Sequence, residues 1–171
     1  QTYSDWDQIP LPRGPHNPAL RLAHKRFVTD SYVKFQKMQI DAIRPHIASS
    51  VWITHNTMNW FGGFDHYKLH ADLDMASWDW YIGTGHNDPL ETGAAHDLVR
   101  GYKKRNFWVM ETQPGHVNWA GVNNDLHKGE GRTMAWEAVS HGADGFLYWQ
   151  WRSAPNGQEQ MHGTLLDQSG E

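Results

Sequence analysis

Glu111 is the side chain whose position most clearly suggests chemistry. It follows the apolar run 107–110, which is continuous as in a strand buried on both faces, and Pro114-Gly115 ends the run soon afterwards. A carboxylate at the end of a buried strand is unfavourable unless it faces a polar opening, and in a barrel of alternating strands and helices that opening holds the active site. Glu111 is therefore a candidate catalytic carboxylate, although its position alone also allows an ordinary loop glutamate.

Other polar and aromatic side chains follow predicted strands and could gather around this carboxylate: Asp79, Tyr81, Trp119, Glu159 and His162. Cleavage of a glycosidic bond commonly uses two carboxyl groups. One protonates the leaving oxygen, and the other attacks the anomeric carbon or activates water. Glu111 suits the second role. Each of the other side chains could also be a rim aromatic, a packed loop residue or a solvated polar group.

The elements that must position these residues begin with a long helix. Asn17-Pro18 is a helix start signal, and Arg44-Pro45 ends the pattern. Apolar and small side chains recur between them at helical spacing and predict one amphipathic face: Leu20, Phe27, Ser31, Phe35, Met38 and Ala42.

Strands and helices then alternate. Strands are predicted over 51–56, 75–81, 107–111 and 144–149, and helices over 67–71, 94–104 and 129–141. This alternation indicates parallel β/α units and an α/β fold. A doubly wound sheet would need helices on both faces, whereas these strands end in residues suited to one shared opening, so half of a (β/α)8 TIM barrel fits better. Such a half should leave two open strand edges and an uncovered interior face.

Composition narrows the classes of function. The 171 residues suffice for one domain, and 10 Trp concentrate apolar area in flat side chains suited to stacking on sugars. A net charge of −4 without a basic run argues against nucleic acid, and no apolar run approaches transmembrane length. Cys is 0, which excludes thiolate sites. Since the first residue is Gln1, we expect sequence upstream of it.

Two alternatives to an enzyme remain open from the residues alone. The tryptophans would also suit a carbohydrate-binding domain without catalysis. The 12 His include His66 and His70, one helical turn apart, which could hold a metal ion. No third ligand is obvious nearby, so we predict neither a metal site nor a cofactor.

Several separate stretches together resemble glycoside hydrolase family 42, the bacterial β-galactosidases. They are QTYSDW at 1–6, FWVMETQPG at 107–115, YWQWR at 148–152 and GQEQMHG at 157–163. The resemblance runs along the whole chain and agrees in order and spacing. It implies the C-terminal half of the catalytic barrel, about strands 5–8, with residues 1–171 forming one partial domain.

The resemblance also implies a role for each candidate residue. Glu111 matches the catalytic nucleophile at the end of strand seven, and Tyr81 matches a tyrosine that contacts both nucleophile and sugar. Trp119 matches a tryptophan lining the galactose site. Glu159 and His162 match a pair that hydrogen-bonds galactose hydroxyls.

One departure from the family pattern bears on activity. The family's acid/base is a Glu directly after an Asn near the end of strand four, and no Asn-Glu dipeptide occurs in this sequence. The resemblance thus implies a retaining β-galactosidase acting on β-galactosides such as lactose, with the isolated chain inactive. It further suggests a trimer for the complete enzyme, and we expect a cytoplasmic location.

Overall fold

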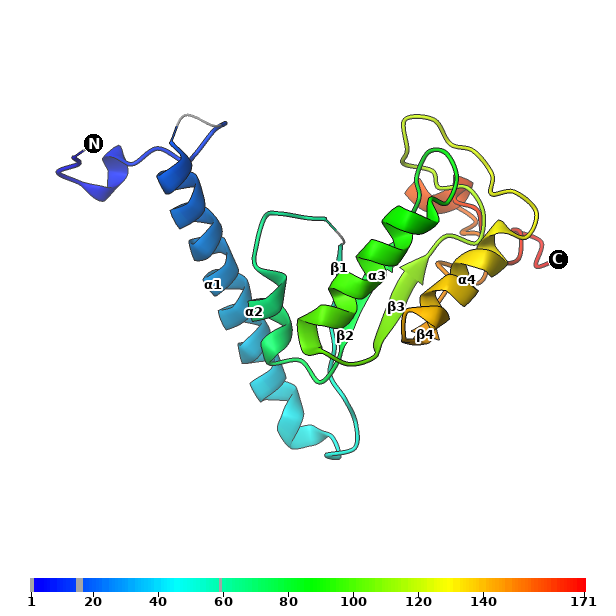
Figure 1. Ribbon diagram of the computed structural model, residues 1–171, viewed down its shortest axis with the longest axis horizontal. Helices are drawn as coiled ribbons and strands as arrows, with labels where there is room; N and C mark the ends of the chain where they lie inside the picture. Colours follow the sequence, from blue (N-terminus) through cyan, green and yellow to red (C-terminus); the bar gives the residue numbers. More distant parts are fainter. Residues whose placement is uncertain (1, 15–16, 59) are drawn as a thin grey trace.

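The computed structural model describes residues 2–14, 17–58 and 60–171 and shows a chain of alternating helices and strands (Figure 1). In order, the main elements are α1 (Pro18–Ile43), β1 (Asn56–Met58), α2 (His66–Ala71), β2 (Ala76–Trp80), α3 (Pro89–Lys103), β3 (Phe107–Thr112), α4 (Glu130–Ser140) and β4 (Ala143–Phe146). Short 3-10 helices lie at Trp6–Gln8, Arg44–His46 and Gln158–Met161. No helix in these described stretches combines the length and apolarity needed to span a membrane.

The strands form one parallel sheet in the order β1-β2-β3-β4. Strands that follow one another in the chain are therefore neighbours, joined by helices, as in successive β/α units of a barrel. The α/β prediction with a parallel sheet is confirmed. β1 and β4 each have one partner within the described chain, so each leaves an edge.

The hydrophobic core lies between the sheet and helices α3 and α4. Trp78 of β2 and Phe107 and Val109 of β3 are fully buried against Val99 of α3 and Met134 of α4, with other apolar residues around them. Because side chains alternate across a strand, the intervening positions of β2 and β3 face the opposite side of the sheet. At the amino ends of the strands this opposite side holds a cavity of about 810 Å³, lined in part by Trp52 and Trp108.

The first strand is shorter and later than predicted. Residues 51–55 lie outside the ladder, and β1 starts at Asn56. The carboxylate of Asp74 accepts a hydrogen bond from the Ile53 amide at 2.6 Å, and Thr54 Oγ1 donates to the Met75 carbonyl at 3.0 Å. One backbone hydrogen bond, from the Asp74 amide to the Ile53 carbonyl at 2.9 Å, also joins the two segments, but side chains make the other contacts where a strand would continue its ladder.

The other predicted elements need smaller corrections. α3 begins at Pro89 instead of residue 94, because Asp88 caps it by accepting from the Leu90 amide at 2.9 Å. β4 ends at Phe146 instead of residue 149. Its course still follows β3, since the amide of Trp149 donates to the Thr112 carbonyl at 2.8 Å.

The prediction of which face of α1 is packed was wrong. Phe27, Phe35 and Met38 are 68%, 59% and 61% exposed, whereas Thr29 and Gln36 are buried. Gln36 Nε2 donates to the Leu69 carbonyl at 2.8 Å, and Thr29 Oγ1 accepts from the Asp65 amide at 2.9 Å. Polar side chains bonded to α2 and its cap therefore decide the orientation. The spacing predicted the helix correctly but could not identify its neighbour.

His96 of α3 makes the core sensitive to acid. It is fully buried against Trp78 and Phe107, at ring distances of 5.1 and 5.5 Å, and neither ring nitrogen has a hydrogen-bond partner. Its pKa is lowered from 6.5 to about 4, chiefly by burial and also by the nearby His141, while Asp97 opposes the shift.

Replacing His96 with Phe should remove part of the loss of stability in acid. The unfolded chain binds a proton at this position below pH 6.5, while the folded chain resists it down to about pH 4. Stability is therefore fully present above pH 6.5 and falls between these values, by on the order of 3 kcal/mol. Urea unfolding at pH 7 and pH 5 should show a smaller difference for His96→Phe. An unchanged difference would contradict this account. A residual difference is expected, because burial also lowers the pKa of His70.

Candidate active site

Glu111 accepts hydrogen bonds from two neighbouring segments. The Tyr81 hydroxyl, which follows β2, donates to Oε2 at 3.1 Å. The side-chain amide of Asn56 in β1 donates to Oε1 at 3.2 Å. Both oxygens of the carboxylate are thus oriented by donors, one from the segment after β2 and one from the first residue of β1. A carboxylate fixed in this way can act as a nucleophile or as a base.

A second carboxyl group shares the Asn56 amide. Asn56 Nδ2 lies 2.9 Å from Oδ1 and 2.7 Å from Oδ2 of Asp79. Asp79 pairs in register with Glu111 at an irregularity between β2 and β3, so both carboxyl groups lie at the same level of the sheet. Burial raises the pKa of Asp79 to about 6; the Asn56 hydrogen bond lowers it, and the Glu111 charge raises it.

The two carboxyl groups open into a cavity of about 540 Å³ that has aromatic walls. Trp60, Trp80, Tyr81 and Trp119 line it together with Asp79 and Glu111, as do several loop residues. The rings of Tyr81 and Trp119 meet edge to face at 5.7 Å. A small cavity with an aromatic wall and a few polar groups suits a sugar ring, which has one apolar face and several hydroxyls.

Tyr81 remains a hydrogen-bond donor. Burial raises the pKa of its phenol well above the ordinary value, and the charges of Glu111, Asp79 and Glu159 raise it further. The hydroxyl is thus protonated throughout the physiological range. It can donate to Glu111 whenever that carboxylate is ionised.

His162 lies beside Tyr81, and neither His162 nor Glu159 lines the cavity that contains Glu111. The buried ring of His162 meets that of Tyr81 edge to face at 6.1 Å, and its Nε2 has no hydrogen-bond partner. Burial lowers its pKa. Glu159 is exposed and accepts from Trp149 Nε1 at 3.0 Å. The structure thus groups four of the five predicted residues through contacts with Tyr81, and it links Glu159 to the group through its charge.

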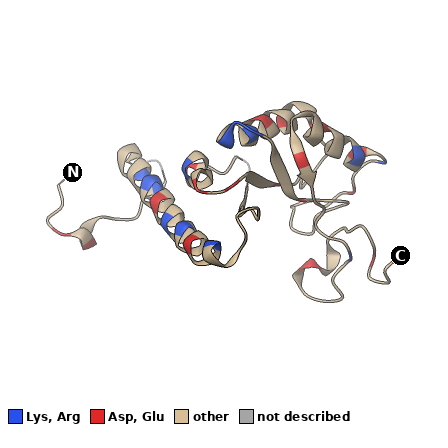
Figure 2. Cartoon of the chain, turned by 90° about the horizontal axis from the view of Figure 1, so that it is seen from below, with Lys and Arg blue, Asp and Glu red and all other residues tan. Residues whose placement is uncertain are grey.

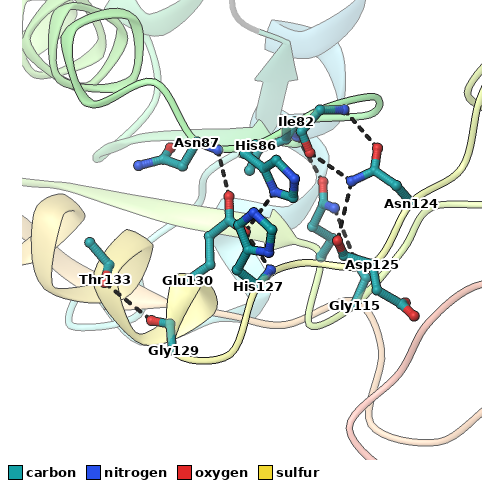
Figure 3. Close-up of polar contacts among 12 residues, drawn as sticks. Ile82, His86, Asn87, Gly115, Asn124, Asp125, His127, Gly129, Glu130 and Thr133 are labelled. Atoms are coloured by element: carbon teal, nitrogen blue, oxygen red, sulfur yellow. Dashed lines mark hydrogen bonds and ion pairs between the residues drawn. The ribbon is translucent and has the colours of Figure 1, made fainter.

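Buried Gln113 supports the loop that carries Tyr81. Its side-chain oxygen accepts from the Ile82 amide at 2.7 Å, and its amide donates to the Gly115 carbonyl at 2.8 Å. Figure 3 shows Ile82 and Gly115 on the two loops that this side chain joins. The loop after β2 is therefore held against the loop after β3.

A second linkage ties the same loop to the start of α4 (Figure 3). The Glu130 carboxylate accepts from the amides of Asn87 and His127, both at 2.6 Å, and from His86 Nδ1 at 3.0 Å. The rings of His86 and His127 stack at 3.6 Å. Burial acts to raise the pKa of Glu130, but these hydrogen bonds outweigh it and hold the pKa below its ordinary value.

The histidines considered as metal ligands are engaged in packing. His70 Nδ1 bonds to the His66 carbonyl oxygen at 2.8 Å, and both rings stack on Tyr102. Across residues 2–14, 17–58 and 60–171, no group of three or more His, Asp or Glu is placed to hold a metal ion.

Asn56 is a site residue that the sequence reasoning did not select, and Asp79 was considered but given no role. The signal for Asn56 was the same as for Tyr81, since it stands at the carboxyl end of a predicted strand. The asparagine side chain is uncharged and cannot be one of the two carboxyl groups that cleave a glycosidic bond. Its residue type therefore gave no reason to select Asn56.

A nucleophile-like carboxylate with aromatic neighbours, at the carboxyl ends of parallel β/α strands, places the protein among carbohydrate-processing barrels. The sequence profile of glycoside hydrolase family 42, described as beta-galactosidase, matches residues 1–171. The chain belongs to this family.

Relatives of known name support this assignment. A Thermus thermophilus beta-galactosidase is 39% identical over 186 residues, covering 96% of this chain and 28% of that protein. The crystal structure of a Marinomonas beta-galactosidase is 38% identical, with a TM-score of 0.85, over 99% of this chain and 29% of that one. The Halorubrum lacusprofundi beta-galactosidase structure is 36% identical with a TM-score of 0.89, and the match covers 100% and 28% of the two chains. The chain therefore spans a little over a quarter of each relative.

Replacing Gln113 with Met should destabilise the chain by about 2 kcal/mol, because it leaves the half-buried Ile82 amide and Gly115 carbonyl without their partner. Urea unfolding measures this loss. Gln160→Met, a change at an exposed position, is the matched control and should have little effect. Equal stability of the two variants would show that the linkage contributes nothing.

Proposed function

We propose that this chain is the C-terminal part, about strands 5–8, of the catalytic barrel of a retaining β-galactosidase. The observation that carries the proposal is the Glu111 carboxylate held by Tyr81 and Asn56 at the mouth of a cavity with aromatic walls. Family membership supplies the substrate class, terminal β-D-galactose in β-galactosides such as lactose.

Uncovered surfaces of three kinds support a place in a larger barrel: strand edges, one face of the sheet and one face of α1. β1 and β4 each have an unpaired edge among the described residues, and the cavity beside Trp52 and Trp108 lies on the sheet face away from the core. α1 adds an exposed row that includes Phe27, Phe35 and Met38. Apolar surface of this extent is characteristic of an interface. A further set of β/α units would cover all three surfaces.

In the proposed mechanism a Glu111 oxygen attacks the anomeric carbon and forms a covalent galactosyl-enzyme. Tyr81 orients this carboxylate and stays protonated while it does so. Trp119 covers the apolar face of the sugar, and Glu159 with His162 binds its hydroxyls. The proton for the leaving oxygen comes from a second carboxyl group, which the family resemblance places outside residues 1–171.

A hybrid enzyme tests the role of Glu111. Residues 1–171 would replace the matching segment of the Thermus thermophilus beta-galactosidase. A mechanism-based fluorogalactoside should then label Glu111, as identified by peptide mass spectrometry, and Glu111→Gln should abolish both labelling and turnover. Glu137→Gln, at a helical position of α4, is the control and should keep both. A hybrid that binds galactose but is never labelled would favour the alternative, a carbohydrate-binding domain without catalysis.

The isolated chain should not turn over nitrophenyl galactosides usefully. Without general-acid help the rate should fall by roughly a hundredfold to ten-thousandfold. Steady-state assays of the purified chain and the hybrid, at matched concentrations, measure the difference. Hydrolysis by the isolated chain that Glu111→Gln abolishes would contradict the prediction and would show that these residues contain a sufficient acid.

A further inference from the structure

Three neighbouring strands each contribute one polar side chain to a hydrogen-bonded group around the nucleophile: Asn56 from β1, Asp79 from β2 and Glu111 from β3. Asp79 and Glu111 are in register, whereas Asn56 lies opposite Ser77 and reaches both carboxyl groups through its side chain. The hydroxyls of Thr54 and Ser77, each two residues earlier in the chain than Asn56 and Asp79, pair with each other at 2.8 Å and have no hydrogen bond to Glu111. The hydrogen bond to Glu111 thus distinguishes Asn56 from these neighbouring polar side chains.

The Asn56 amide connects the two carboxyl groups. Its nitrogen lies within 2.9 Å of both Asp79 oxygens and 3.2 Å from Glu111 Oε1. An NH₂ group has two protons, so one can point to each carboxyl group. Two carboxylates that share one amide lie close enough to repel each other. A second carboxylate beside a nucleophile is therefore unfavourable unless Asp79 has a function there. Holding the amide in place is a task that this geometry allows.

We propose that Asp79 is a positioning residue for the nucleophile: it fixes the Asn56 amide so that this amide holds Glu111 in the attacking orientation. This inference rests on the proposed function of Glu111. It adds two residues of the chain, Asp79 and Asn56, to those that determine the rate of the covalent step.

The positioning depends on the charge of Asp79. An ionised carboxylate accepts the amide proton more strongly than a protonated one, which also gains a donor of its own. The pKa of Asp79 is raised to about 6, chiefly by burial and also by the charge of Glu111 from β3. Tyr81, His86, Asp88 and Glu91 are further titratable groups that line the same cavity, and β1 contributes the neutral Asn56. As the pH falls through about 6, Asp79 takes up a proton, the amide is released, and attack by Glu111 slows.

The experiment isolates the nucleophilic step in the hybrid enzyme. The inactivator is a dinitrophenyl fluorogalactoside. When it reacts, a Glu111 oxygen forms a bond to its anomeric carbon. Dinitrophenolate then departs with the electron pair of the broken C–O bond. No proton transfer is needed, so the rate of inactivation reports on the nucleophile and not on the acid/base residue. This rate is measured against pH and inactivator concentration.

Asp79→Asn keeps an oxygen for Asn56 but cannot ionise. It should lower the limiting rate of inactivation about tenfold, the size of effect expected from one weakened charge-assisted hydrogen bond, while the inactivator's dissociation constant changes less than about twofold. The decline in rate below about pH 6 should disappear. Asn56→Ala should lower the rate by a similar factor. Ser77→Ala, on the same strand and face without contact to Glu111, should change neither rate nor profile.

An Asp79→Asn hybrid with the rate and pH profile of the parent would overturn the inference and leave the proposed function intact. Loss of labelling at Glu111 in the parent hybrid would instead overturn the proposed function. A second measurement does not depend on turnover. Carbon-13 NMR of the 171-residue chain should show the Asp79 carboxyl titrating near pH 6, and titrating lower in Glu111→Gln. An Asp79 pKa that is the same in the parent chain and in Glu111→Gln would also contradict the inference.

Discussion

Parallel pairing of β1, β2 and β3 is the constraint on which the site depends. It brings residues more than twenty positions apart in sequence to one level of the sheet, because parallel neighbours begin and end at the same edge. The irregularity between β2 and β3 aligns Asp79 with Glu111. Repulsion between the two carboxyl groups is then moderated by the single Asn56 amide. Much of the electrostatics of the site follows from that alignment.

The core and the site use opposite faces of the same strands. On β2, Trp78 packs against α3, while Asp79 beside it turns toward the cavity. On β3, Val109 packs in the core, and the register irregularity, which places one extra residue between Val109 and Glu111, lets Glu111 face the cavity. A change in strand register would therefore disturb packing and chemistry together. Figure 2 shows positions of both charge signs distributed along the chain, with Lys or Arg and Asp or Glu positions both present on α1.

Side-chain hydrogen bonds hold the loops after β2 and β3 in place. Gln113 joins the loop after β2 to the loop after β3, and Glu130 joins the former to the start of α4. Both are polar side chains that replace backbone pairing where the strands have ended. Loops that carry substrate-binding residues need such support, because a small displacement of an orienting group greatly reduces the rate of a reaction.

The sequence by itself determined the alternation of helices and strands, the parallel class of the sheet and the position of Glu111 at a strand end. Hydrophobic period, proline and capping residues are local signals, and they sufficed for these features. Only the tertiary structure decided which face of α1 is packed, where β1 begins, and that Asn56 joins Asp79 to Glu111. These features depend on partners distant in the chain. The Asp74 carboxylate accepts from the Ile53 amide ahead of β1, and Gln36 and Thr29 bond α1 to α2 and its cap. Local periodicity does not encode such contacts, because it describes a segment and not the neighbour against which that segment packs.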